Sequence, residues 1–537
     1  MSIPYRYQHR SPGSYLHIFG LLAFTFIVFG PLLSLVVDSA GYLASEPGQV
    51  IPTERSSGLL FNSIALAFCV AAGGMILGVM IASVLWRWQS GRKHSLRWFL
   101  LVFAPIPPYV HALAWSTSMS YLSDILVRFG LPGISLQGWS GSWWVQLMAL
   151  LPIAVGLSLI GFESVEVTMI EAARLVRSDI QVLLRVILPL MAPMLAASTG
   201  ILFLLSLVDY SVPSLFGLNV YSLEIFAEYG ATNQPSSAFL LALPELFITL
   251  AVILLARNAL KDAVQNQVRS RAGTYDWPLW FTWLQRFAII VLFLQISILV
   301  LSLVSSVGTG KDLALTISMS RSEISFTFWI CIAASLICLP FALAAAHEMQ
   351  RKDWRGTVWW VLVISPLAVP APLVGIGMVS LWNRPLWYEL YGTSAMPLLA
   401  LLARFTPLAA IVLMTQLRRI DPLLLDAAQV FDTHPLRTWF QVRLPLMTPG
   451  LMAAAFITFA LSIGELGATL ITVPPGRGTL TLKIYNYLHY GASEQVAGLC
   501  LMMVAITLLA GFLAMIMLRG WSRLMPDNRR IREDTGI

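Results

Sequence analysis

The segments Glu171-Ala172-Ala173 and Leu188-Pro189-Leu190-Met191-Ala192-Pro193 occur a second time, as Asp426-Ala427-Ala428 and Leu444-Pro445-Leu446-Met447-Thr448-Pro449. The two copies start 255 residues apart (426 − 171). Within the motif the spacing differs by one residue, with 18 from Glu171 to Pro189 and 19 from Asp426 to Pro445. Each copy is a short polar segment between long hydrophobic stretches, which indicates a helix-turn-helix outside an apolar environment.

Landmarks on both sides of the motif keep the same spacing in the two copies. Pro152 and Pro407 each lie 19 residues before the acidic residue of the motif (171 − 152 and 426 − 407). Asp209 and Glu465 each lie 20 residues after the proline of Leu-Pro (209 − 189 and 465 − 445). A spacing that is kept over so long a stretch indicates an internal duplication.

The composition places the chain in a membrane. Of its 537 residues, 57% are hydrophobic and 11% are charged, with a mean hydropathy of +0.76, whereas a soluble domain carries about 25% charged residues. Apolar runs of about 20 residues are long enough to cross a hydrocarbon layer, and they predict about twelve spans, six in each half. They begin near Tyr15, Leu59, Trp98, Trp144, Leu190 and Ala238, and near Phe281, Phe326, Val358, Leu398, Pro445 and Val496.

The basic residues predict the orientation, because Lys and Arg in short loops stay on the cytoplasmic side. With the N-terminus inside, seven of the 34 basic residues fall in outer loops and one, Arg404, falls within a span. We therefore expect a multi-pass protein of the bacterial cytoplasmic (inner) membrane with both termini in the cytoplasm. This asymmetry explains the net charge of +7, so no nucleic-acid partner is expected. The seven are Arg55, Arg128, Lys311, Arg321, Arg384, Arg477 and Lys483.

An even number of spans per half means that both halves start on the same side of the membrane. The expected fold is an all-α membrane protein of two parallel six-helix repeats, related by a pseudo-twofold axis along the membrane normal. We expect the first repeat at residues 1–257, a polar cytoplasmic linker at 258–278 and the second repeat at 279–537. A translocation pathway forms naturally on such an axis.

Each repeated loop lies between the fourth and fifth spans of its half, at about residues 163–189 and 418–445. Good helix formers follow Glu171, which supplies the acidic group that a helix start prefers. The proline of Leu-Pro is expected to open the next span, where its missing N–H costs little. The pattern predicts a short helix across the cytoplasmic face of each half, which would offer a partner protein a rigid handle.

The repeated loop has an acid-Ala-Ala motif, a spacer and Leu-Pro, and it lies between the fourth and fifth spans. It resembles the EAA loop of permeases of ATP-binding-cassette (ABC) importers, here with two type I permease units fused in one chain. The resemblance covers essentially the whole chain. It implies that the loop helices dock on separate ATPase subunits, expected to be two copies of one chain, and couple their nucleotide state to the pathway. The residues that match the motif are Glu171, Ala172, Ala173, Asp426, Ala427 and Ala428.

The chain departs from this motif at the turn after the helix. The family has a glycine four residues after the second alanine, where this chain has Arg177 and Asp432, so the turn is expected to close differently. The nearest approach to a phosphate-binding loop, Gly308–Asp312, lacks the required spacing. The chain is therefore expected to be a transport subunit without enzymatic activity or a cofactor of its own, and ATP would bind to the partner.

Ionisable residues within spans are costly and are often functional. Asp209 and Glu465 lie about 30 Å beyond their prolines, at about 1.5 Å per residue, and therefore near the outer end of the fifth spans. They would face each other across the pathway, cap short outer helices or pair with a neighbour. Arg404 has no charged counterpart, because Ala149 holds its place in the first half. Its natural structural role is to pair with an acid such as Glu465.

The third span of each half is rich in helix breakers, which predicts a kink that either borders the pathway or is inert. His111, a lone histidine in this region, is expected to have a hydrogen-bonded packing role. The four cysteines lie in predicted spans without a Cys-x-x-Cys or Cys/His cluster, so neither a disulfide nor a metal site is expected. The breakers are Pro105, Pro107 and Pro108, and Pro366, Pro370, Pro372, Gly375 and Gly377.

The segments Arg404-Phe-Thr-Pro and Gly464-Glu-Leu-Gly-Ala-Thr-Leu resemble the fused ferric-iron branch of these permeases. This resemblance implies ferric iron as the substrate, delivered by an external, periplasmic solute-binding protein, with thiamine and polyamine permeases as alternatives. A gradient-driven secondary transporter is the alternative from another class, in which Asp209 and Glu465 would relay protons or cations. Membrane lipid surrounds the spans in either case.

Overall fold

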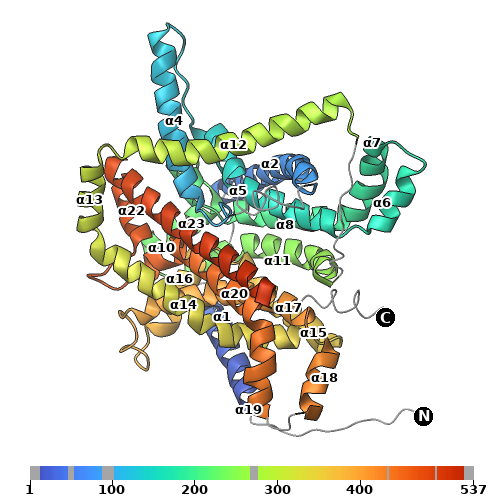
Figure 1. Cartoon of the computed structure of the whole chain (residues 1–537). Coiled ribbons are helices and arrows are strands. Elements are labelled where there is room, and N and C mark those ends of the chain that lie inside the picture. Colours follow the sequence, from blue (N-terminus) through green and yellow to red (C-terminus); the bar gives the residue numbers. More distant parts are fainter. Residues whose placement is uncertain are drawn as a thin grey trace.

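The computed structural model describes residues 13–45, 54–87, 102–265, 276–431, 435–489 and 493–524, and the regular structure in these segments is helical (Figure 1). Within them, ten helices are long and apolar enough to cross a membrane, or eleven if one bent pair counts as a single span. The all-α membrane class is therefore confirmed. The ten are α1 (Gly13–Ser45), α2 (Glu54–Leu85), α5 (Gly138–Glu163), α8 (Leu188–Leu207), α11 (Pro235–Gln265), α12 (Leu279–Ser306), α14 (Arg321–Met349), α17 (Ala395–Arg418), α20 (Leu444–Ile463) and α23 (Ser493–Leu524).

The described residues thus contain fewer spans than the twelve that the sequence predicts, and the difference lies in the two third spans. In the second half, α15 (Trp354–Ile364), a 3-10 turn (Ser365–Ala368) and α16 (Ala371–Trp382) form the bent pair, with an angle of 102°. The prolines predicted to kink this span cause the break, because Pro370 cannot donate a helical hydrogen bond.

In the first half, the predicted start of the third span near Trp98 lies outside the described residues. The helix that follows, α4 (Pro108–Arg128), starts at one of the predicted breakers. It is not among the helices that are apolar enough to span, because Ser116, Ser118, Ser120, Ser123 and Asp124 occupy its second half.

The first helix of each half packs against the other half. α1 lies against α14, α16 and α17, and α12 lies against α2 and α4 (Figure 1). Polar side chains fix both contacts. Arg384 donates to Asp38 of α1 at 2.7 Å, and Trp115 of α4 donates to Gln295 of α12 at 2.6 Å. The two halves are therefore interlocked.

One apolar core joins α2, α5 and α8 of the first half with Trp277 and Phe281 at the start of the second. α2 and α5 approach each other closely at Gly78, where an added Cβ would lie 2.9 Å from the backbone of Ala154. Small residues permit such contacts between membrane helices. α11 continues to Gln265, into the segment expected to be linker, because Ala, Leu, Lys and Gln in that segment favour a helix.

Shorter helices lie at the ends of the spans. The loops that carry the duplicated motif are at the right and lower right of Figure 1, while α13 and α22 are at the left. The motif loops contain α6 (Val167–Arg174) and α7 (Asp179–Val182), and α18 (Pro422–Phe431) and α19 (Pro435–Thr438). The remaining short helices are α9 (Ser211–Leu215), α10 (Tyr221–Thr232), α13 (Gly310–Met319), α21 (Gly467–Thr472) and α22 (Leu480–His489).

Candidate coupling loops and polar seam

The acid-Ala-Ala motif of the first half lies within α6, in the loop that we call the first coupling loop. Glu171 and Ala172 are exposed and Ala173 is half-buried. The helix begins at Val167, four residues before the position that the sequence predicts, so Glu171 lies in its second turn and not at its start. The reason is Ile170, whose buried side chain (2% exposed) joins the core of the first half and anchors the earlier turn.

The second coupling loop contains α18 and has the same arrangement. Asp426 and Ala427 are exposed, and Ala428 is half-buried. Again the helix starts four residues before the acid, here at Pro422, a residue that suits the first helical position. Asp421 caps this start, because its carboxylate accepts from the N–H of Leu423 at 2.9 Å. Asp432 lies outside the described residues.

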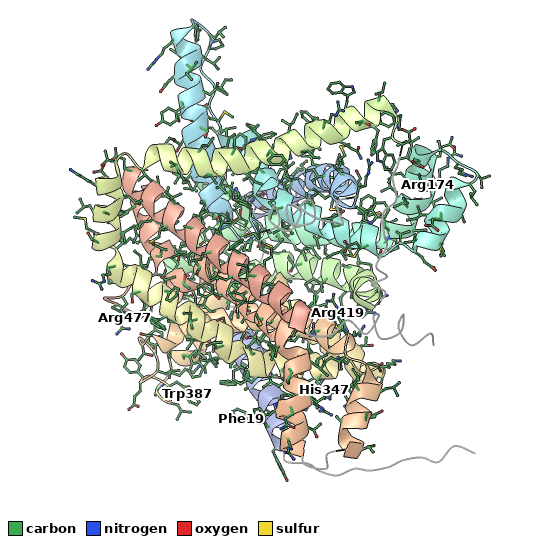
Figure 2. All side chains as sticks on the ribbon, in the orientation of Figure 1. Phe19, Arg174, His347, Trp387, Arg419 and Arg477 are labelled. Atoms are coloured by element: carbon green, nitrogen blue, oxygen red, sulfur yellow. The ribbon has the colours of Figure 1, made fainter. Side chains whose placement is uncertain are left out.

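An ion pair closes the turn after α6, in the place where the family has a glycine. Arg174 Nε lies 2.9 Å from Asp179 Oδ1 at the start of α7, and Figure 2 labels Arg174 in this loop. Arg177 is exposed, and its N–H donates to the carbonyl of Ala173 at 3.0 Å. Asp179 also accepts from the N–H of Asp276, which precedes α12. The first coupling loop is thereby tied to the start of the second half.

The sequence predicts that the proline of Leu-Pro opens a new helix. In the structure it lies inside a continuous one. The span that contains Pro189 runs from Asp179 to Leu207 through a single π-helical turn, Leu183–Ile187. In that turn the N–H of Leu188 reaches back five residues to the carbonyl of Leu183. The second half repeats this feature at Trp439–Arg443 before Pro445. Single π-turns inside α-helices are rare and often lie at functional sites.

Apolar side chains surround the exposed motif residues of both coupling loops. Leu175 is 89% exposed and Val176 is 84% exposed, directly after α6. On α18, Leu423 is 72% exposed and Val430 is 79% exposed. Large apolar side chains that gather at the surface in this way are typical of interaction surfaces.

Asp209 and Glu465 lie at the breaks that follow α8 and α20. Each carboxylate accepts a backbone N–H of the short helix that comes next. The donor to Asp209 is Ser211 of α9 at 3.1 Å, and the donor to Glu465 is Ala468 of α21 at 2.9 Å. Capping of short helices, one of the three roles expected for these acids, is therefore present in both halves.

The same two acids also pair with side chains from the fourth span of their own half. Arg404 on α17 forms the expected ion pair with Glu465, with Nε and Oε2 2.7 Å apart. Asp209 accepts instead from Gln146 Nε2 on α5 at 3.0 Å. Gln146 is missing from the residues that the sequence singles out, because it lies one turn before Ala149, the position that the duplication matches to Arg404. A search of the neighbouring turn for polar residues would have found it.

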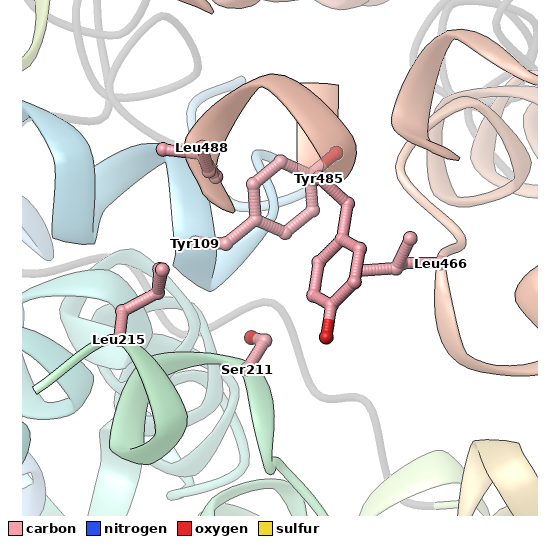
Figure 3. Close-up of a pocket in the computed structure, with 6 residues that line it drawn as sticks. All are labelled: Tyr109, Ser211, Leu215, Leu466, Tyr485 and Leu488. Carbon is pink, nitrogen blue, oxygen red and sulfur yellow. The ribbon is translucent and has the colours of Figure 1, made fainter. Parts of the chain in front are cut away.

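Tyrosines from both halves surround these acids. We call the region formed by Asp209, Glu465, their partners Gln146 and Arg404, and these tyrosines the polar seam. Tyr210 is 4% exposed, and its hydroxyl has no partner among the described residues. It lies within electrostatic reach of Glu465, Asp209 and Arg404. A small pocket beside it has a lining from both halves (Figure 3), made of Tyr109, Ser211, Leu215, Leu466, Tyr485 and Leu488.

His111 of α4 is buried, and its Nδ1 contacts Gln295 Nε2 at 2.5 Å. This agrees with the hydrogen-bonded packing role expected for it. Within the described part of the chain, no group of three or more His, Cys, Asp or Glu side chains could hold a metal ion. The polar seam therefore offers oxygen and nitrogen groups along an interface, without a closed ligand set.

Comparisons with known proteins agree with this architecture. Residues 338–525 match the family described as the binding-protein-dependent transport system inner membrane component. The molybdenum transport system permease ModB of Haemophilus influenzae is 30% identical over 208 residues, covering 36% of this chain and 90% of ModB. The ferric transport system permease FbpB of Actinobacillus pleuropneumoniae is 24% identical over 507 residues, covering 88% of this chain and 73% of FbpB.

The chain belongs to this family, the inner-membrane permeases of binding-protein-dependent ABC transporters. Its similarity to the ferric transport permeases extends over almost its full length. The Fe(3+)-transport system permease FbpB 2 of Haemophilus influenzae is 22% identical over 496 residues, covering 90% of this chain and 94% of FbpB 2. The chain is thus a multi-pass inner-membrane transport component and not an enzyme, and such a permease works with an ATPase and a binding protein.

Proposed function

We propose that this chain is a two-unit permease in which both coupling loops transmit ATP-driven closure of a separate ATPase pair to the translocation pathway. The observation that carries the proposal is the duplicated motif on two helices that are flanked by exposed apolar side chains. Leu175 and Val176 on one loop and Leu423 and Val430 on the other fit a partner surface better than water. An ATPase that binds both loops would cover them.

The continuous helices supply a route from these loops to the polar seam. The helix that begins at Asp179 ends at Leu207, two residues before Asp209. The second one runs from Trp439 to Ile463, two residues before Glu465. ATP binding would draw α6 and α18 together, and the helices would pass this displacement to the seam. The pathway would then change from inward-open to outward-open.

We infer further that the halves are parallel repeats, 1–257 and 279–537, with both termini in the cytoplasm. Two matched hydrogen bonds support the duplication. The N–H of Tyr221, at the start of α10, donates to Ser63 of α2 at 2.8 Å. The N–H of Leu480, at the start of α22, donates to Thr327 of α14 at 2.8 Å. The excess of Lys and Arg on the side of the coupling loops supports the orientation.

Ferric iron is the substrate that we propose. The similarity over nearly the full length is to ferric transport permeases, and the carboxylates and phenols of the polar seam are oxygen groups that hard cations prefer. Thiamine and polyamines are the alternative substrates within the family. A gradient-driven carrier remains the alternative from another class, with Asp209 and Glu465 as relays.

The coupling proposal is tested with the double variant Glu171→Lys and Asp426→Lys, reconstituted with its ATPase and binding protein. We expect transport to be lost while the chain still inserts and co-purifies less ATPase. The control is Asp124→Lys, which replaces one acid by Lys at an exposed position of α4 and should leave transport unchanged. Full transport in the double variant would contradict docking through these helices.

The substrate proposal needs a separate measurement. Proteoliposomes that contain the complete transporter are prepared with and without ATP inside. Their uptake of radiolabelled ferric iron, thiamine and putrescine is then compared. ATP-dependent uptake of iron alone supports the proposal. Uptake that follows a proton or sodium gradient without ATP would favour the secondary carrier.

A further inference from the structure

Glu245 on α11 is a carboxyl group that the transport mechanism above does not use. Its residue is fully buried (0% exposed) within a membrane-spanning helix. The described residues contain no Lys, Arg or His in an ion pair with it, and its Oε2 has no hydrogen-bond partner among them. Its titratable neighbour is Tyr221, whose hydroxyl already donates to the carbonyl of Leu241 at 2.6 Å. A carboxylate in such a place would be an unpaired charge in an apolar medium, which is costly.

The hydrogen bonds around Ser222 determine where the protons are. The hydroxyl oxygen of Ser222 lies 2.8 Å from the carbonyl oxygen of Leu207 and 3.0 Å from Glu245 Oε1. A serine hydroxyl has one proton to donate, and a backbone carbonyl has none. Both contacts can be two-centre hydrogen bonds only if Ser222 donates its proton to Leu207 and a second proton lies between Ser222 and Glu245. That second proton can come only from the carboxyl group.

We infer that Glu245 is held as a neutral carboxylic acid that donates a hydrogen bond to Ser222, and that this proton fastens α11 to the junction between α8 and α10. Leu207 is the last residue of α8, and Ser222 is the second residue of α10. The chain from Glu245 through Ser222 to Leu207 therefore ties three helices together two residues before Asp209. In this role Glu245 is a positioning residue for the polar seam, a role that rests on the proposed pathway.

The second half makes the corresponding link without an acid. Thr481 is the second residue of α22, and its hydroxyl donates to the carbonyl of Glu465 at 3.0 Å. The hydroxyl of Thr479, which directly precedes α22, lies 2.9 Å from that of Thr481. A neutral hydrogen-bonding group is thus sufficient at this junction, which is consistent with a Glu245 that does not need to ionise.

Infrared spectroscopy of the complete transporter in nanodiscs tests the protonation directly, whether or not the transport assay works. We expect the carbonyl stretch of a protonated carboxylic acid in the difference between the unsubstituted chain and Glu245→Gln. The band should persist from about pH 6 to about pH 7, where an ordinary glutamate is ionised. The control is Glu389→Gln, at an exposed position, which should remove no such band. A missing band, or one that titrates in this range, would overturn the inference.

Transport by two variants tests the positioning role. Glu245→Gln keeps a donor for Ser222 and should retain transport at every pH at which the unsubstituted chain is active. Glu245→Met has a similar size but no donor, and we expect a loss of about tenfold, as for one buried hydrogen-bonding group left unpaired. Loss of transport in Glu245→Gln with normal assembly would show that the charge of Glu245 is needed and would refute a fixed proton. Equal transport in both variants would refute the positioning role.

Discussion

Gln146 donates to Asp209 at 3.0 Å from a position one helical turn before Ala149, the residue that the duplication matches to Arg404. The acids that follow the two fifth spans are therefore held differently. Glu465 has a cation as its partner, whereas Asp209 has a neutral amide. The polar seam is thus unequal in charge, even though the sequence around it is duplicated.

This inequality predicts different costs for removing the two partners. Arg404→Met would leave Glu465, whose side chain is 6% exposed, as a buried charge without its cation. We expect a loss of about 3 kcal/mol, as for other broken buried ion pairs. The measurement is the thermal melting of the purified complex in mild detergent.

Gln146→Met is the matched comparison on the other side of the polar seam. Asp209 would keep its hydrogen bonds with the N–H and the hydroxyl of Ser211, so we expect a loss of only about 1 kcal/mol. Adding Glu465→Gln to Arg404→Met should recover part of the stability, because it removes the stranded charge. Equal losses in the two single variants would contradict this account.

The turn after α6 should depend on the ion pair between Arg174 and Asp179. Arg174→Ala removes the contact with Asp179 at 2.9 Å and frees the end of the coupling helix. Charge-assisted hydrogen bonds of this kind contribute about 1.5–3 kcal/mol, so we expect at least a tenfold drop in ATP-driven transport. ATP hydrolysis that continues without transport would identify the defect as uncoupling. Arg177→Ala is the control, because the exposed Arg177 side chain should not be needed to close the turn.

The contact between Gly464 and Pro107 should tolerate no added side chain. A Cβ at Gly464 would lie 2.2 Å from Cγ of Pro107, which belongs to the other half. Gly464→Ala should therefore push the halves apart and cost about 1–3 kcal/mol, as overpacking does elsewhere. Gly230→Ala on α10, where an added Cβ meets nothing within 4 Å, should be neutral or slightly stabilising. Melting temperatures of the two variants provide the test.

The short helix α13 should lose its cap at acid pH. Thr309 donates to the Asp312 carboxylate through its hydroxyl at 2.6 Å and its N–H at 2.9 Å, and these hydrogen bonds hold the pKa of Asp312 below its usual range. A carboxyl whose pKa is lowered in the folded state adds stability above its unfolded pKa, and that contribution is lost as the pH falls through its folded pKa. We therefore expect weaker protection of residues 310–319 below about pH 4.

Hydrogen exchange of this segment measures the effect. After correction for the pH dependence of the intrinsic exchange rates, the protection of this segment in the unsubstituted chain should fall at acid pH. The protection in Asp312→Asn should change little with pH. An identical pH dependence in both chains would assign the effect to another group.

Local patterns in the sequence predict the features of this fold that depend on neighbouring residues. Apolar runs locate the spans, the prolines at 366, 370 and 372 predict the bend of the third span, and an intramembrane Arg404 requires an acid such as Glu465. The starts of α6 and α18 are harder to predict. Ile170 shows why, because it lies before the acid and is buried only once the loop packs on the core.

Contacts between distant residues are the part that the sequence does not predict. Gln146 and Asp209 are 63 residues apart, and Glu245 and Ser222 belong to different helices. The pair of Glu245 and Ser222 follows neither from periodicity nor from the duplication, whereas Gln146 is found only by a search of the turn beside the position matched to Arg404. The first helix of each half packs against the other half, so that the two helices are exchanged between the halves. This exchange also leaves no local pattern, since α1 is equally apolar whichever half it contacts.

This exchange has a consequence for biogenesis. The ribosome releases α1 well before Arg384, the partner of its Asp38, which is 346 residues further along the chain. At about 5–20 residues per second, the second partner appears about 17–70 s after the first. Throughout that interval α1 lies in the bilayer without its neighbours from the second half, with Ser34 and Asp38 unmatched. The nascent first half therefore cannot complete its assembly before α14, α16 and α17 of the second half have been made.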